Sequence, residues 1–403
     1  MDIPKDAVTP DVILVLQPRT VDDPWLPNLE SFECDNATKA FCSFIPLFLS
    51  PKTTKIDIGF APDTPTMVVA SMIARFSTLC PDLERVTLYG LPRDPAVTEA
   101  ASEMLLACNR RNALQTFRVD SPLTEDAREV VYRLPRLTRF WAVIQASTSL
   151  PTVALPNLTV IDVEYDDLNW LPGFRGATLE KLESVTFRSE SEKIDDFLEA
   201  FESFALAASA QNTLSVFNFY TSRSWNPNYS SLLSFDQLKE VMIQASCRGD
   251  CSSKIDDDII VDMARAMPKL EILQLGDMPC GIPTGITSNG LIGLARLCPH
   301  LSILRIHFQA ASLVEAATSA ATLSPYDEPI GRWEDCALKD LEVGRIRIPA
   351  QSGLTVALIL LQIFPRILKI AYSNQEWNTV ATTILNFRRI GALVHRSGIV
   401  HPS

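Results

Sequence analysis

Met267-Pro-Lys-Leu-Glu-Ile-Leu-Gln-Leu275 contains the pattern that decides the fold of this chain. An apolar residue is followed by Pro, any residue and Leu, and this Leu opens a frame Leu-x-x-φ-x-φ, where φ is apolar. Proline does not continue a helix, and alternating apolar residues are typical of a strand with one buried face. The stretch therefore predicts the end of a helix followed at once by a strand.

The same phrase, with Leu or Ile in its last position, occurs seven times. The copies begin at Leu26, Cys80, Leu134, Leu155, Met267, Cys298 and Phe364. Thirteen frames can be aligned in all, with first residues Leu29, Thr53, Leu83, Leu114, Leu137, Leu158, Leu182, Leu214, Leu238, Leu270, Leu301, Leu338 and Ile367. Their mean spacing of about 28 residues is typical of leucine-rich repeats.

Apolar residues at helical spacing lie between many of these frames. We expect helices at 66–79, 96–108, 195–210, 258–267, 289–298 and 354–364. Strand, turn and helix in right-handed order predict an α/β leucine-rich-repeat solenoid, a horseshoe with parallel strands on its concave face and helices on its convex face. A doubly wound parallel sheet has the same alternation and is the alternative fold.

The frames also predict how the chain is organised. We expect residues 1–25 to form an N-terminal cap segment with one short strand at 12–16. Residues 26–373 would form an array of about 13 irregular repeats, and 374–403 a C-terminal helical cap and tail.

Composition restricts the partners and the compartment. The net charge of −12 over 403 residues argues against nucleic acid, because phosphate binding needs a basic surface. The longest apolar stretch, 354–364, is too short to cross a membrane. The start of the chain has no secretory signal pattern, and the nine cysteines are scattered without a disulfide spacing. We therefore expect an intracellular monomer, cytoplasmic or nuclear.

The sequence contains no motif that predicts catalysis. It lacks a Gly-x-Ser-x-Gly elbow and a Gly-x-x-x-x-Gly-Lys phosphate loop, and its four histidines have no zinc-ligand spacing. We expect a protein that is not an enzyme and needs neither a metal nor another cofactor.

Frame positions 3, 5 and 7 are expected on the concave face, because strand side chains alternate. Arginines and aromatic residues there are typical of binding hot spots, and we expect Trp141 to be exposed. Long connections at 220–235, 276–287 and 322–336 follow the carboxyl ends of strands, where binding loops gather. The candidate protein-binding residues are Arg85, Tyr89, Arg118, Arg139, Trp141, Glu164, Arg188, Tyr220, Trp225, Arg305 and His307.

Residues 267–308, the segment 354–372 and the stretch 44–51 resemble the F-box leucine-rich-repeat proteins of mushroom-forming fungi. The resemblance implies substrate recognition in a cullin-type ubiquitin ligase, where F-box helices bind an adaptor and the repeats hold the protein to be marked. We expect the F-box itself to be missing, because the first frame opens at Leu29. A repeat scaffold with no ubiquitin-ligase role is the alternative, and neither pattern names the bound protein.

Overall fold

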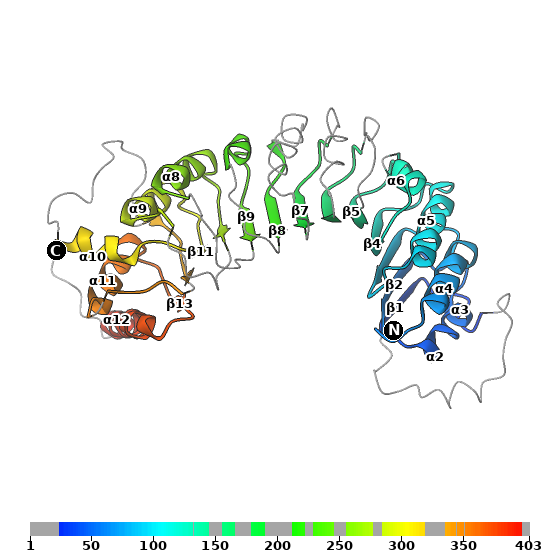
Figure 1. Cartoon of the computed structure of the whole chain (residues 1–403), viewed down its shortest axis with the longest axis horizontal. Helices are drawn as coiled ribbons and strands as arrows, with labels where there is room; N and C mark the ends of the chain where they lie inside the picture. Colours follow the sequence, from blue (N-terminus) through cyan, green and yellow to red (C-terminus); the bar gives the residue numbers. More distant parts are fainter. Residues whose placement is uncertain are drawn as a thin grey trace. The chain divides into compact units, whose positions relative to one another are not determined.

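The computed structural model of the chain is a mixed α/β fold with thirteen parallel strands in chain order (Figure 1). It describes residues 24–131, 133–144, 155–165, 179–189, 212–221, 229–245, 255–276, 284–318, 335–343, 345–349 and 351–396. These residues form two compact units. Unit 1 contains the described residues up to Arg188, and unit 2 contains those that follow.

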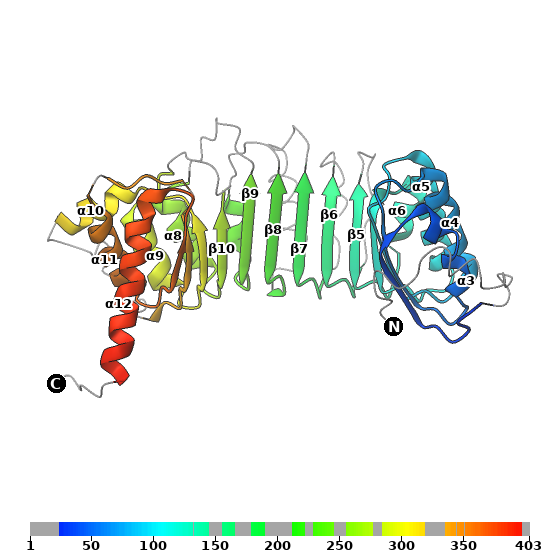
Figure 2. The same ribbon diagram turned by 90° about the horizontal axis from the view of Figure 1, so that it is seen from below.

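Unit 1 has one strand per frame. Its strands are β1 (Ser31–Ala37), β2 (Lys55–Phe60), β3 (Arg85–Tyr89), β4 (Thr116–Pro122), β5 (Arg139–Ile144), β6 (Val160–Tyr165) and β7 (Ser184–Ser189). Its helices are α2 (Lys39–Cys42), α3 (Ile45–Phe48), α4 (Thr66–Leu79), α5 (Pro95–Asn109) and α6 (Glu125–Val131). Strands β5, β6 and β7 run side by side in the same direction (Figure 2).

Unit 2 repeats the plan, and its last four strands are shorter. Its strands are β8 (Val216–Thr221), β9 (Glu240–Ala245), β10 (Ile272–Leu275), β11 (Ile303–Ile306), β12 (Asp340–Glu342) and β13 (Lys369–Ala371). The helical elements are η3 (Tyr229–Ser234), α8 (Asp257–Ala266), α9 (Ser288–Leu297), α10 (Ala310–Thr318), α11 (Gly353–Ile363), η5 (Gln375–Trp377) and α12 (Asn378–Arg396).

The proline phrase forms the predicted junction between helix and strand. At the end of α8, the Met267 N–H donates to the Met263 carbonyl (2.9 Å), which closes the last helical turn. Pro268 then takes the chain out of the helix, and the Leu270 N–H returns to the Met267 carbonyl (3.1 Å). The same pair of bonds occurs where α9 ends at Cys298 and where α11 ends at Phe364. The junction predicted from the sequence is confirmed.

The frame positions predicted to face inward form the core. Leu270, Leu273 and Leu275 are at most 1 % exposed. Of the thirteen first residues, twelve are buried and Leu29 is half-buried. Burying a leucine side chain contributes about 1.5–3 kcal/mol, so the frames supply much of the stabilisation.

Backbone hydrogen bonds between consecutive turns hold the repeats in register. The carbonyl of frame position 2 accepts two N–H groups from the next turn. Glu271 accepts from Ser302 (2.8 Å) and Ile303 (3.2 Å). Glu84 accepts in the same way from Gln115 and Thr116. The bonding is independent of side chain, which explains how frames of different length stay aligned.

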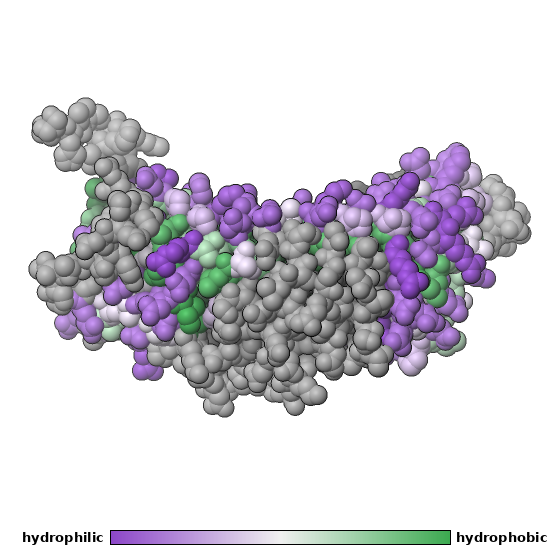
Figure 3. Space-filling view, turned by 90° about the horizontal axis from the view of Figure 1, so that it is seen from above, coloured by the Kyte–Doolittle hydropathy of each residue, from purple (hydrophilic) through white to green (hydrophobic). Residues whose placement is uncertain are grey.

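Five of the six predicted helices are confirmed as α4, α5, α8, α9 and α11. The sixth, at 195–210, and the strand expected at 12–16 lie outside the described residues. Among the helices that the structure describes, none is both long enough and apolar enough to span a membrane. Where residues are described, the face seen in Figure 3 is mostly hydrophilic, with smaller hydrophobic areas between.

Candidate functional site

In unit 1, the described helices cover only one face of the strands. Helices α4, α5 and α6 lie along one side of its strands (Figure 1), and no described helix lies on the other. We call this other side the open face. Frame positions 3, 5 and 7 of β1–β7 face it, because positions 1, 4 and 6 fill the core.

A cluster of four side chains occupies the middle of the open face. Arg118 of β4 lies opposite Trp141 of β5 in the strand register, and Trp141 lies opposite Asp162 of β6. The Arg118 guanidinium lies over the Trp141 ring, 5.4 Å from its centroid. Arg188 of β7 forms an ion pair with Asp162. We call these four residues the central cluster.

The expectation that Trp141 is exposed is wrong. Its side chain is only 9 % exposed, although it points away from the core. The Arg118 guanidinium covers one face of the ring, and the neighbouring strand brings Asp162 alongside. A cation over an aromatic ring contributes about 0.5–1 kcal/mol at an exposed site and more when water is excluded. Trp141 therefore acts as a platform that positions Arg118.

Burial raises the pKa of Asp162 above its ordinary value of 3.8, although the nearby charges of Arg188 and Arg118 lower it. Taking the carboxylate out of water thus outweighs the ion pair. The folded chain therefore binds the proton at Asp162 more tightly than the unfolded chain does. The protonated, neutral form of Asp162 is therefore more favoured in the central cluster than it would be in water.

Asp162→Asn is expected to preserve or raise the free energy of unfolding at pH 7, because Asn mimics the neutral acid. The folded pKa is raised, so stability from this group is lost as pH rises from 3.8 through the folded value. The advantage of the variant should therefore shrink as the pH falls through that window toward 3.8. Urea unfolding at pH 7 and pH 4 measures both. A variant less stable than wild type at pH 7 would contradict the expectation.

Three arginines on the open face are candidates for contact with a partner. Arg85 and Arg139 are exposed on β3 and β5, and the Thr116 position of β4 lies between them. Arg118 is exposed as well. Within the described ranges, none of the three forms an ion pair. Their charges therefore face solvent in a chain that is acidic overall.

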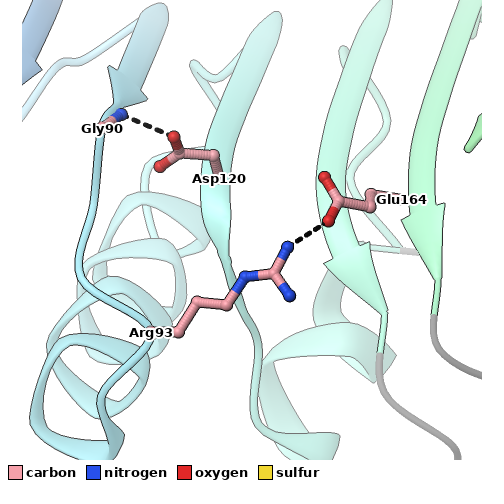
Figure 4. A network of polar contacts seen from close by, with 4 residues as sticks. All are labelled: Gly90, Arg93, Asp120 and Glu164. Atoms are coloured by element: carbon pink, nitrogen blue, oxygen red, sulfur yellow. Dashed lines mark hydrogen bonds and ion pairs between the residues drawn. The ribbon is translucent and has the colours of Figure 1, made fainter. Parts of the chain in front are cut away.

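The loop after β3 crosses toward the ends of neighbouring strands. The Asp120 carboxylate accepts from the N–H groups of Gly90 (2.5 Å) and Leu91 (3.0 Å), and Arg93 forms an ion pair with Glu164 on β6 (Figure 4). Gly90 has φ 71°, and a Cβ there would lie 2.6 Å from the Phe60 carbonyl oxygen. The loop geometry thus requires glycine.

An acidic group borders the arginines on β1 and β2. Glu33 and Asp57 are neighbours in register. Asp35 accepts a hydrogen bond from the Tyr89 hydroxyl (3.0 Å). Burial, followed by the charge of Glu33, raises the pKa of Asp57. The open face therefore has an acidic edge beside a basic centre.

The residues expected in unit 2 do not form a comparable surface. Arg305 is held by Gln274 (2.9 Å) and Glu342 (3.1 Å). His307 is only 3 % exposed and so offers a partner little surface, and its role in binding stays a prediction. His307 follows β11 directly. The Thr284 hydroxyl donates to the His307 carbonyl (2.5 Å), which holds the segment that begins at Thr284 beside it.

Tyr220 is half-buried. Trp225 lies outside the described residues, as do residues 222–228, 277–283 and 322–334 of the long connections.

Asp35, Arg93 and Asp120 belong to the site but were not among the predicted residues. Asp35 and Asp120 occupy position 7 of their frames, so the alternation could have found them. Arg93 lies in a loop, where no periodic signal exists. Only the folding of that loop over β4 brings it to Glu164.

In the part of the chain that the structure describes, no three His, Cys, Asp or Glu side chains are grouped so that they could hold a metal ion. Burial raises the pKa of the Cys80 and Cys298 thiols to about 12. These thiols stay protonated and pack as small apolar groups. Comparison of the chain with protein-family models and with curated proteins found no match.

Proposed function

We propose that the chain is a non-catalytic protein-binding module with a leucine-rich-repeat horseshoe fold, and that the open face of unit 1 holds its partner. The observation that carries the proposal is the central cluster beside Arg85 and Arg139. Exposed arginines around a buried aromatic platform have the composition of an interface hot spot.

The contacts within the cluster reduce the cost of binding. Arg118 is already positioned by the Trp141 ring, so its side chain loses less conformational entropy when a partner docks. Arg188 is held by Asp162 in the same way. The acidic edge on β1 and β2 lies next to this basic centre. The fitting partner is a protein segment whose acidic residues meet the arginines and whose basic residues meet Glu33 and Asp57.

We propose further that the bound protein is a ubiquitin-ligase substrate. The resemblance of 267–308 and 354–372 to F-box repeat proteins supports this step. The scaffold alternative has no adaptor partner. Recovery of the ligase adaptor with the gene product from cells therefore separates the two: recovery favours the ligase role, and consistent absence favours the scaffold.

The double charge reversal Arg118→Glu with Arg139→Glu is expected to weaken partner capture by at least about tenfold, because it places like charges opposite an acidic segment. The tagged chain would be used to capture proteins from cell extract at low salt, with quantification by mass spectrometry. Capture by the wild-type chain should also fall as salt rises.

The matched control is Arg75→Glu with Arg110→Glu. Both residues are exposed, Arg75 on α4 and Arg110 at the end of α5, away from the open face. This control makes the same charge change and should retain the partner. Equal capture by both double variants, or equal loss from both, would count against the open face.

A further inference from the structure

A cavity lies in unit 2, at the carboxyl ends of β11, β12 and β13. Its volume is about 880 Å³, within the range of small-ligand sites. Arg345 and Arg347 line it, and none of the described residues on its wall is acidic. In a chain of net charge −12, a cavity whose described wall carries two arginines and no carboxylate is unexpected.

The backbone places both arginines on one side. Residues 345–349 run without a helix, and burial alternates along them: Ile346 and Ile348 are buried, while Arg345 and Arg347 are exposed. Alternating side chains of an extended segment point to opposite sides, so the two guanidinium groups share the cavity side.

Two anchors hold this segment. The buried Trp377 indole N–H donates to the Ile346 carbonyl (2.7 Å). The Glu376 carboxylate accepts from the Ile348 N–H (2.9 Å). The Glu376 carboxylate thus has a backbone partner of its own. In the described ranges neither Arg345 nor Arg347 forms an ion pair.

Apolar residues and neutral hydrogen-bonding residues form the rest of the described wall. The hydrogen-bonding ones are Gln309, Ser373, Asn374 and Gln375. The Gln309 amide Nε2 donates to the Thr284 carbonyl (3.1 Å), which fixes the amide in place. Amides and hydroxyls can donate to an oxyanion, while the arginine forks bind two of its oxygens at once.

From this geometry we propose that the cavity beside Arg345 and Arg347 binds the phosphate group of a phosphate monoester. Two guanidinium groups match the double negative charge and the oxygen geometry of such a group. The group could come from a free phosphate ester or from a phosphorylated side chain of a bound protein. The proposal does not depend on the open face of unit 1.

Titration calorimetry with phenyl phosphate, and with a short phosphotyrosine peptide, tests the site. Wild-type chain is expected to bind at least one of them at one site. The variant Arg345→Gln with Arg347→Gln should bind at least about tenfold more weakly, because it loses two charge-assisted contacts. Arg389→Gln, an exposed arginine on α12 outside the cavity, is the matched control and should bind as wild type does.

The two arms identify the source of the group. Equal affinity for phenyl phosphate and the peptide supports a free phosphate ester, and much tighter peptide binding supports a phosphorylated protein. Three results would overturn the site: no binding of either probe up to about 10 mM, equal binding of phenol or the unphosphorylated peptide, or full binding by a folded double variant. Circular dichroism establishes that the variant is folded.

Discussion

Trp377→Ala should lower the free energy of unfolding by about 3–5 kcal/mol, the range for removing a large aromatic side chain from a core. Trp377 is fully buried, and its ring meets Phe308 edge to face with centroids 6.0 Å apart. Its indole N–H also donates a hydrogen bond to the Ile346 carbonyl. Truncation would leave a cavity and an unpaired carbonyl together. Urea unfolding followed by circular dichroism gives the measurement.

Trp377→Phe separates the contribution of ring packing from that of the hydrogen bond to Ile346. The substitution keeps an aromatic ring in the core but removes the hydrogen bond to Ile346, so we expect a smaller loss of about 1–3 kcal/mol. If both substitutions cost less than about 1 kcal/mol, the anchoring of residues 345–349 by Trp377 would be refuted.

Leu270→Ala is the second substitution with a large expected effect. Leu270 is the first residue of its frame and is 0 % exposed, so its truncation should cost about 2–5 kcal/mol. Leu354→Ala makes the same chemical change on α11, where the side chain is 54 % exposed, and should stay within about 0.5 kcal/mol of wild type. Chemical denaturation of both variants measures the difference.

This pair of leucines tests the frame directly. A similar loss of stability for both variants would mean that position 1 of the frame is not a core position. A small loss for Leu270→Ala alone would contradict the burial on which the repeat depends.

Local chemistry explains why so much of the architecture could be predicted. Pro268 ends its helix whatever structure follows. In the strand after it, side chains alternate, so Leu273 and Leu275 lie on the same face and are buried together. The position-2 carbonyls then bond to the next turn whatever their side chains are. The order of strands, five of the helices and the inward positions follow from these short-range rules.

Tertiary structure alone decided which polar side chains meet. Trp141 was expected in solvent, but register across β4 and β5 places it under Arg118. Arg93 reaches Glu164 only because its loop folds over the intervening strands. Arg345 and Arg347 share a cavity because Trp377, some thirty residues later, holds the backbone between them. A repeat pattern specifies which face of the strand a side chain lies on. Its contact partners come from distant segments of the chain, and local sequence preferences do not determine which of those segments lie next to it.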